Sequence, residues 1–132
     1  MGTIQKFEDI ISWQEARALN KEVGQLIDNE RFKKNFKLIT HIEGSAGSIM
    51  DNIAEGFERG GNREFIQFLY IAKGSCGELR SQLYRALDRS YILENEFELM
   101  SVQAKKISNL IQKLINYLQG SEITGVKYKG RN

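Results

Sequence analysis

Proline is absent from the 132 residues, although average usage would give about six. Because proline breaks the interior of a helix, its absence permits long uninterrupted helices. Cysteine and histidine occur once each, as Cys76 and His41. One cysteine excludes an intrachain disulfide and a cysteine zinc cage, and one histidine excludes the paired Glu-x-x-His motifs of a di-iron bundle. We therefore expect no metal and no cofactor.

An excess of one charge and a long apolar run are also lacking. The 19 basic and 17 acidic side chains leave a net charge of +2, and the whole excess falls in residues 121–132. No stretch approaches the roughly 20 apolar residues of a membrane span. The first residues carry no apolar signal-peptide core. We expect a cytoplasmic protein with no membrane association.

Apolar residues recur at helical spacing along most of the chain. In the clearest case they are spaced alternately three and four apart, which is a heptad seam: Phe97, Met100, Ala104, Ile107, Ile111, Leu114 and Leu118. Similar stripes predict helices over 9–28, 33–58, 62–88 and 94–119, with Asn62 as an N-cap and Gly120 as a C-terminal stop. Short connections make successive helices antiparallel.

These patterns predict an all-α, up-down-up-down antiparallel four-helix bundle. It forms one domain over residues 1–120, and residues 121–132 form a flexible basic tail. Small residues gather at 44–48 and 74–77, where each interior glycine costs about 1 kcal/mol of helix stability. Three explanations remain open: close approach of two helices, approach of a ligand to the backbone, or a break near Gly44.

Few residues of the sequence suit catalysis. Cys76 lies on an apolar stripe, where a buried structural thiol is the ordinary outcome. Asn52 and Glu55 are three residues apart, and we interpret them as a polar clasp at the corner between the second and third helices. One carboxylate without a second titrating group makes a poor acid–base site. We therefore expect a protein that is not an enzyme and that has no small-molecule substrate.

The third helix carries a second face beside its apolar stripe. This face holds two tyrosines among cations at heptad spacing: Tyr70, Lys73, Arg80 and Tyr84. Such a face suits a subunit contact. It also suits nucleic acid, through stacking and phosphate contacts, and a plain solvated surface is the third alternative. We assign these four residues to an oligomer interface.

Three segments resemble a known family. Residues 48–59, which include Asn52-Ile53-Ala54-Glu55-Gly56, resemble the Ser-Ile-x-x-Asn-Ile-Ala-Glu-Gly signature of the bacterial four-helix bundle proteins linked to 23S rRNA intervening sequences. Residues 64–79 resemble the next block of that family, and Trp13-x-x-Ala16 resembles its first-helix pattern. The family includes accessory proteins of diversity-generating retroelements, which form homopentamers and bind a reverse transcriptase and RNA. The resemblance therefore implies a homopentamer.

Two functions follow as hypotheses. The first is a non-enzymatic oligomeric adaptor that binds RNA or an RNA-handling protein. Its expected nucleic-acid contacts are the tail and the corner of the second and third helices: Lys127, Lys129, Arg131, Arg59 and Arg63. The alternative is a structural or regulatory protein-interaction bundle without a nucleic-acid role. It rests on the neutral charge of residues 1–120 and on Glu43-Gly44, where family members commonly carry a basic pair.

Overall fold

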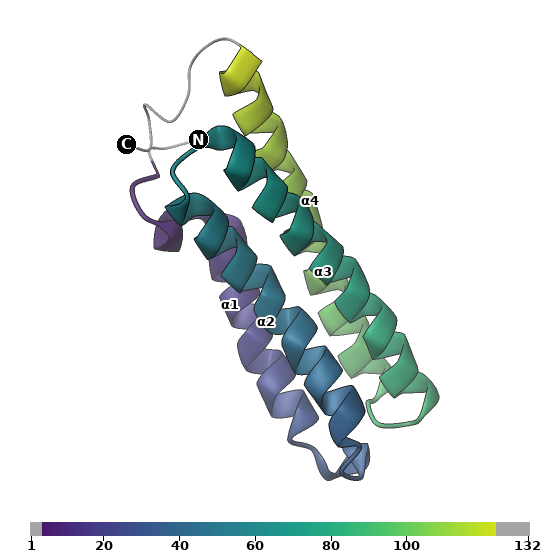
Figure 1. Ribbon diagram of the computed structural model, residues 1–132. Coiled ribbons are helices and arrows are strands. Elements are labelled where there is room, and N and C mark those ends of the chain that lie inside the picture. Colours follow the sequence, from purple (N-terminus) through teal and green to yellow (C-terminus); the bar gives the residue numbers. More distant parts are fainter. Residues whose placement is uncertain (1–3, 124–132) are drawn as a thin grey trace.

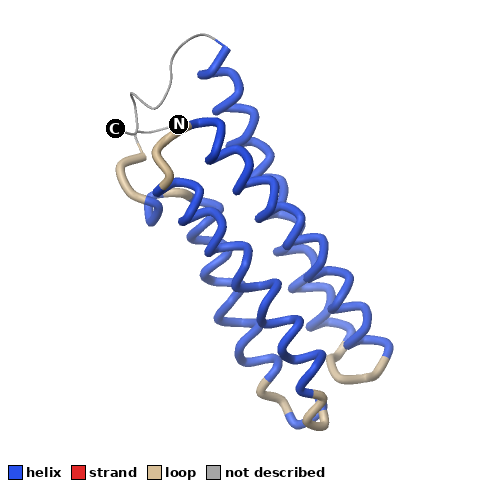
Figure 2. The backbone as a smooth tube through the Cα atoms, in the orientation of Figure 1, coloured by secondary structure: helices blue, strands red, loops and turns tan. Residues whose placement is uncertain are grey.

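The computed structural model describes residues 4–123 of the chain. Four long helices account for most of them: α1 (Ile11–Ile27), α2 (Phe36–Glu58), α3 (Asn62–Asp88) and α4 (Glu94–Ile123). Two single-turn 3-10 helices, η1 (Phe7–Asp9) and η2 (Glu30–Phe32), precede α1 and α2. The described part contains no strand, as Figure 2 shows.

The helices run alternately up and down the long axis of the molecule (Figure 1). The α1–α2 and α3–α4 connections lie at one end, and the α2–α3 connection lies at the other. Each helix packs against its neighbour in sequence, and α4 closes the ring against α1. Short connections impose this order, because they leave a following helix no route except back along its predecessor. The predicted up-down-up-down bundle is confirmed.

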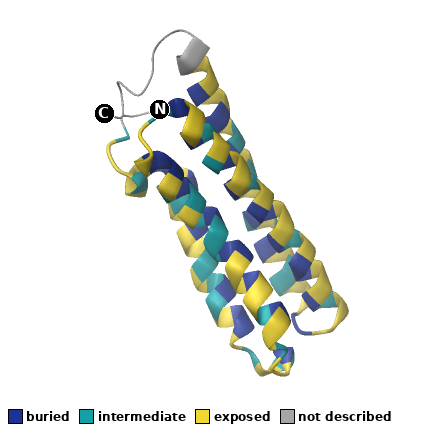
Figure 3. Ribbon diagram, in the orientation of Figure 1, coloured by how far each residue is buried: buried dark blue, intermediate teal, exposed yellow. Residues whose placement is uncertain are grey.

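One continuous apolar core fills the bundle axis. The buried faces of the four helices all turn inward, as Figure 3 shows. The heptad seam of α4 is buried from Met100 to Leu118, with Phe97 partly buried at its start. The largest fully buried side chains include Leu19, Ile49 and Leu79. Spacing of three and four residues predicted these faces because it keeps side chains on one side of a helix.

Two predicted details of the helix starts are wrong. The second helix begins at Phe36 and not at 33, because Lys33 and Lys34 adopt left-handed backbone conformations, with φ of 51° and 60°. Phe36 is therefore 67% exposed and lies outside the core. Asn62 is the first residue inside α3 rather than its N-cap, which is Gly61.

The end of the fourth helix also differs from the prediction. Gly120 does not stop α4, which continues to Ile123. A glycine ends a helix by taking a positive φ, and among the described glycines only Gly60 does so. Three residues assigned to the tail therefore belong to the helix.

A polar cluster ties the two connections at one end of the bundle. The Arg31 guanidinium contacts Glu96 Oε1 at 2.6 Å and donates to the Tyr91 carbonyl at 3.2 Å. Asn35 Nδ2 donates to the Tyr91 hydroxyl at 3.2 Å. These contacts join residues about 60 positions apart in sequence, so they fix how the α1–α2 hairpin meets the α3–α4 hairpin.

Candidate interaction surfaces

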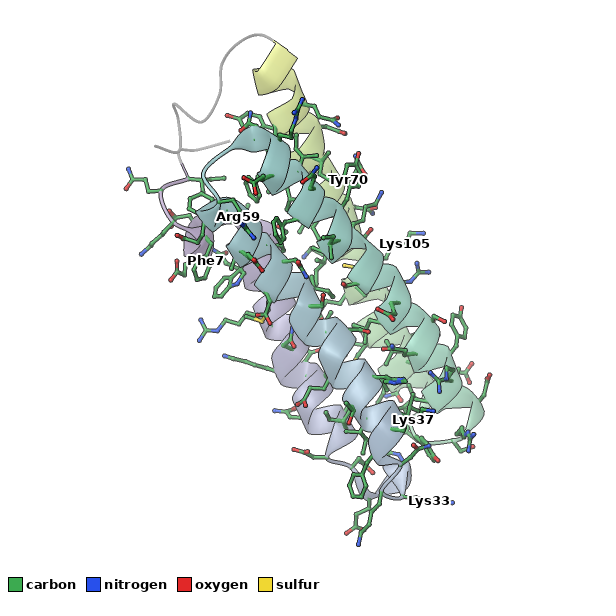
Figure 4. All side chains as sticks on the ribbon, in the orientation of Figure 1. Phe7, Lys33, Lys37, Arg59, Tyr70 and Lys105 are labelled. Atoms are coloured by element: carbon green, nitrogen blue, oxygen red, sulfur yellow. The ribbon has the colours of Figure 1, made fainter. Side chains whose placement is uncertain are left out.

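The predicted second face of α3 lies along its border with α4. Lys73 Nζ donates to Gln112 Oε1 of α4 at 2.7 Å, so this lysine joins two helices of one chain. Tyr84 packs on Phe97 of α4, with ring centroids 4.6 Å apart. Tyr70 is 47% exposed and stands on the α3 surface in Figure 4. The four residues thus divide between contacts within the bundle and exposed surface.

Arg80, the fourth residue of this face, lines a groove that runs along α4. The groove has a volume of about 720 Å³. It is lined by Arg80, Phe97, Glu98, Ser101, Val102, Lys105, Lys106, Asn109, Leu110 and Lys113. Its apolar members come from α4, and its charged members are four cations and one carboxylate.

The cations of the groove differ in their partners. Lys106 forms an ion pair with Glu15 of α1 at 3.4 Å. Arg80, Lys105 and Lys113 form no ion pair within residues 4–123. The groove therefore presents an unbalanced positive charge, and Figure 4 marks Lys105 on this side of the molecule. We name these three residues with Phe97 the α3–α4 basic groove.

Sequence reasoning missed the α4 part of this groove, because it read the lysines between the apolar positions as an ordinary polar outer face. One signal was available. Residues 99–120 contain Lys105, Lys106 and Lys113 and no acidic residue. That imbalance is hidden by the three glutamates at the start of the same helix, which bring the net charge of the predicted helix, residues 94–119, back to zero.

At the α2–α3 corner, carboxylates neutralise one of the two arginines that were predicted to contact nucleic acid. Arg59 lies 3.3 Å from Glu55 and 3.8 Å from Glu64, and its guanidinium stands over the Phe68 ring at 5.2 Å. Arg63 is exposed and forms no ion pair in the described part of the chain. The corner thus offers one cation already balanced by two carboxylates and one that is not.

The predicted polar clasp divides into two separate contacts. Glu55 pairs with Arg59 on the surface of α2. Asn52 Nδ2 donates to both the carbonyl and the hydroxyl oxygen of Ser48 at 2.8 Å. Ser48 Oγ lies 2.9 Å from Ser75 Oγ of α3, so Asn52 supports a serine bridge between the two helices. No hydrogen bond joins Asn52 to Glu55 among the described residues.

The small-residue clusters face one another, but their glycines do not make the contact. Ser45, Ala46, Ser75 and Cys76 are buried. A Cβ built on Gly44, Gly47, Gly74 or Gly77 would meet nothing within 4 Å. Ser48 and Ser75 make a side-chain contact between α2 and α3 in this region, with their hydroxyl oxygens 2.9 Å apart, and both helices are continuous there. Packing does not explain the four glycines.

The described residues hold a buried thiol and no cluster of potential metal ligands. Cys76 is fully buried, and burial raises the pKa of its thiol to about 12. The thiol therefore stays protonated and unreactive at neutral pH. Residues 4–123 hold no cluster of three or more potential metal ligands. They also hold no helix with the length and apolar content needed to cross a bilayer. The predicted tail contacts, Lys127, Lys129 and Arg131, lie outside the described residues.

The fold and surfaces define a small helical bundle whose notable features are surface grooves. The family model described as "23S rRNA-intervening sequence protein" matches residues 8–113, so the chain belongs to this family. The resemblance noted in residues 48–79 is thereby confirmed.

A solved structure supports the same fold. It is the crystal structure of a protein of unknown function from the S23 ribosomal protein family of Bacteroides thetaiotaomicron. The two chains are 20% identical, with a TM-score of 0.71 over 80% of this chain and 98% of that one. None of the curated proteins compared with the chain matches it.

Proposed function

We propose that the protein is a non-enzymatic, homo-oligomeric adaptor that binds RNA through the α3–α4 basic groove. The observation that carries the proposal is the charge of this groove. Three cations that form no ion pair within residues 4–123 line the groove together with aromatic and apolar side chains, and Glu98 is its single acid. Phosphates bind such cations, and bases stack on aromatic side chains beside them.

Tyr84 and Phe97 suit the stacking part of this role. Tyr84 is 53% exposed although it packs on Phe97, so one ring face supports it while other parts of the ring remain open to solvent. Arg80 lies beside this aromatic pair at the edge of the groove. An aromatic platform next to a guanidinium is typical of surfaces that hold single-stranded segments with little sequence preference.

Homo-oligomerisation is the second part of the proposal. The exposed apolar side chains Tyr70, Ile71 and Tyr117 are each about half accessible in the isolated chain, which suits burial against another copy. The family resemblance implies a homopentamer. Repeated grooves in one assembly would raise the effective concentration of cations around a bound RNA, so weak single contacts combine.

A salt series tests the RNA proposal. Three phosphate contacts predict that log K against log salt falls with a slope of about −2 for single-stranded RNA. The double variant Lys105→Glu/Lys113→Glu should lose most of this slope and most of the affinity. Lys21→Glu provides the matched control, because Lys21 is an exposed lysine of α1 away from the groove. Equal binding by the double variant and the control would refute the groove.

The tail is tested separately. A chain that ends at Ile123 keeps all of α4 but lacks Lys127, Lys129 and Arg131. If this chain loses RNA binding while Lys105→Glu/Lys113→Glu keeps it, the contacts belong to the tail. If both lose part of the binding, groove and tail act together.

A protein partner is the second candidate function. Leu99 and Val102 are 60% and 67% exposed on α4, and Val102 lines the basic groove. Apolar side chains within a cationic rim also fit an acidic amphipathic helix. Absence of any RNA shift at low salt, for the full chain and in excess of protein, would favour this candidate over the first.

A further inference from the structure

A second cleft lies between α2 and α3, away from the basic groove. Its volume is about 390 Å³. Every residue that lines it is either polar or glycine: Thr40, His41, Gly44, Ser45, Ser48, Glu78 and Gln82. An ordinary seam between two helices is closed by apolar or long side chains. This one exposes hydroxyl, amide and carboxylate groups instead.

Gln82 is the unusual member of the cleft. Its side chain is more than nine-tenths buried, with 7% of the residue exposed. Its Oε1 atom is buried and accepts no hydrogen bond from the described residues. A buried amide oxygen that accepts no hydrogen bond is unfavourable, so a ligand that donates a hydrogen bond to it would be stabilised. Gln82 lines the cleft, and a half-turn about the soft last torsion of its side chain exchanges the amide nitrogen and oxygen, which presents the oxygen to a bound donor.

Ser45 of α2, which lines the cleft across from Gln82 of α3, is also nearly buried and without a hydrogen-bond partner among the described residues. It is 5% exposed, and its hydroxyl forms no hydrogen bond to another described residue. By contrast, Ser48 beside it contacts both Asn52 and Ser75. The cleft therefore holds two nearly buried polar side chains, one from each helix, with unused hydrogen-bonding capacity.

Gly44 keeps the mouth of the cleft open. A Cβ at this position would meet nothing within 4 Å, so packing does not require glycine there. Glycine is unfavourable inside a helix. Any side chain at 44 would lean toward the N-terminal end of α2, where Thr40 and His41 line the same cleft. Its absence leaves the backbone accessible to a bound group.

We propose that this cleft binds the ammonium or guanidinium group of a small organic cation. Gln82 Oε1 and the Ser45 hydroxyl supply acceptors, and the exposed Glu78 supplies the single formal negative charge among the lining residues at neutral pH. Donor-rich cations satisfy buried carbonyl-type oxygens and pair with a carboxylate at once. The proposal is independent of RNA binding at the basic groove.

A titration of the full chain tests the assignment. Agmatine serves as a free guanidinium probe, and an acetylated, amidated Gly-Arg-Gly tripeptide serves as a peptide-borne one. Butylurea is the neutral control, because it has N–H donors and no charge. Proton–nitrogen correlation spectra should show saturable shifts at the Gly44 and Gly47 amides with at least one guanidinium probe. The tighter of the two probes identifies the source of the group.

Two variants and one control locate the binding. Gln82→Leu and Gly44→Leu should each weaken it about tenfold or more, the loss expected for one charge-assisted hydrogen bond or for a blocked mouth. Gly74→Leu is the matched control, because Gly74 is an exposed α3 glycine that does not line the cleft. Circular dichroism verifies that each variant folds. Gly44→Leu introduces a good helix former, so it keeps the proposal testable if Gln82→Leu, which alters a buried site, fails to fold.

Three results would overturn the proposal. The first is no saturable shift with either guanidinium probe up to millimolar concentration. The second is butylurea binding as tightly as agmatine, which would show that the cleft does not require a positive charge on its ligand. The third is unchanged binding in Gly44→Leu while it remains folded, which would place the ligand elsewhere.

Discussion

Gly56 is the one described glycine at which an added Cβ would meet a neighbouring helix, and the substitution Gly56→Ala tests this close approach of α2 to α3. A Cβ at Gly56 would lie 2.6 Å from the Cβ of Phe68 and 3.1 Å from Phe65 Cδ1. The Cβ of Phe68 is fixed to the α3 backbone, so a rotamer change cannot move it away. Ordinary contact begins near 3.4 Å. The two helices must therefore move apart by roughly 1 Å, which disturbs close packing around them.

The magnitude follows from two opposing terms. Overpacking of this kind costs about 1–3 kcal/mol. Replacement of glycine by alanine inside a helix returns up to about 1 kcal/mol, and less near the last turn, where Gly56 lies. We expect a net loss of about 1–2 kcal/mol in the free energy of unfolding. With a urea m-value of about 2 kcal/mol/M, the midpoint falls by about 0.5–1 M.

The matched control is Gly47→Ala in the same helix. A Cβ at Gly47 would meet nothing within 4 Å, so only the helix-propensity term applies. We expect this variant to gain up to about 1 kcal/mol. Urea unfolding followed by circular dichroism measures both variants at equal protein concentration. A Gly56→Ala variant as stable as the wild type, or a Gly47→Ala variant less stable than it, would refute the packing argument.

Three further predictions concern the core and the assembly. Leu79→Ala should cost about 2–5 kcal/mol by chemical denaturation, because Leu79 is fully buried; a loss under about 0.5 kcal/mol would contradict that burial. Cys76 should resist a thiol reagent at pH 8 until the chain unfolds, and stability should fall as pH rises from about 9 toward 12, since the raised pKa favours the neutral thiol in the folded state. Light scattering at micromolar concentration should give a mass well above 15.2 kDa, with five chains as the expected number; a monomer would reject the proposed oligomer.

The family resemblance and the helical architecture could be predicted from the sequence because they depend on local and periodic signals. Spacing of three and four residues identifies a buried face without knowledge of the partner helix. The α4 seam from Met100 to Leu118 is the clearest example. The ends of the helices were harder to predict. Lys33 and Lys34 adopt left-handed backbone conformations just before α2, but neither residue is a glycine or proline that would signal such a conformation in the sequence.

The surfaces depended on the tertiary structure. Sequence spacing placed Lys73 and Arg80 on one face, but only packing showed that Lys73 bonds to Gln112 of α4 while Arg80 lines a groove with Lys105. The same holds for Ser45 and Gln82, which are 37 positions apart and line one cleft. Helical periodicity records which side of its own helix a residue occupies. Whether that side meets a neighbouring helix, a cleft or solvent is decided by how far each helix rotates and slides as its large core side chains interlock with those of its neighbours.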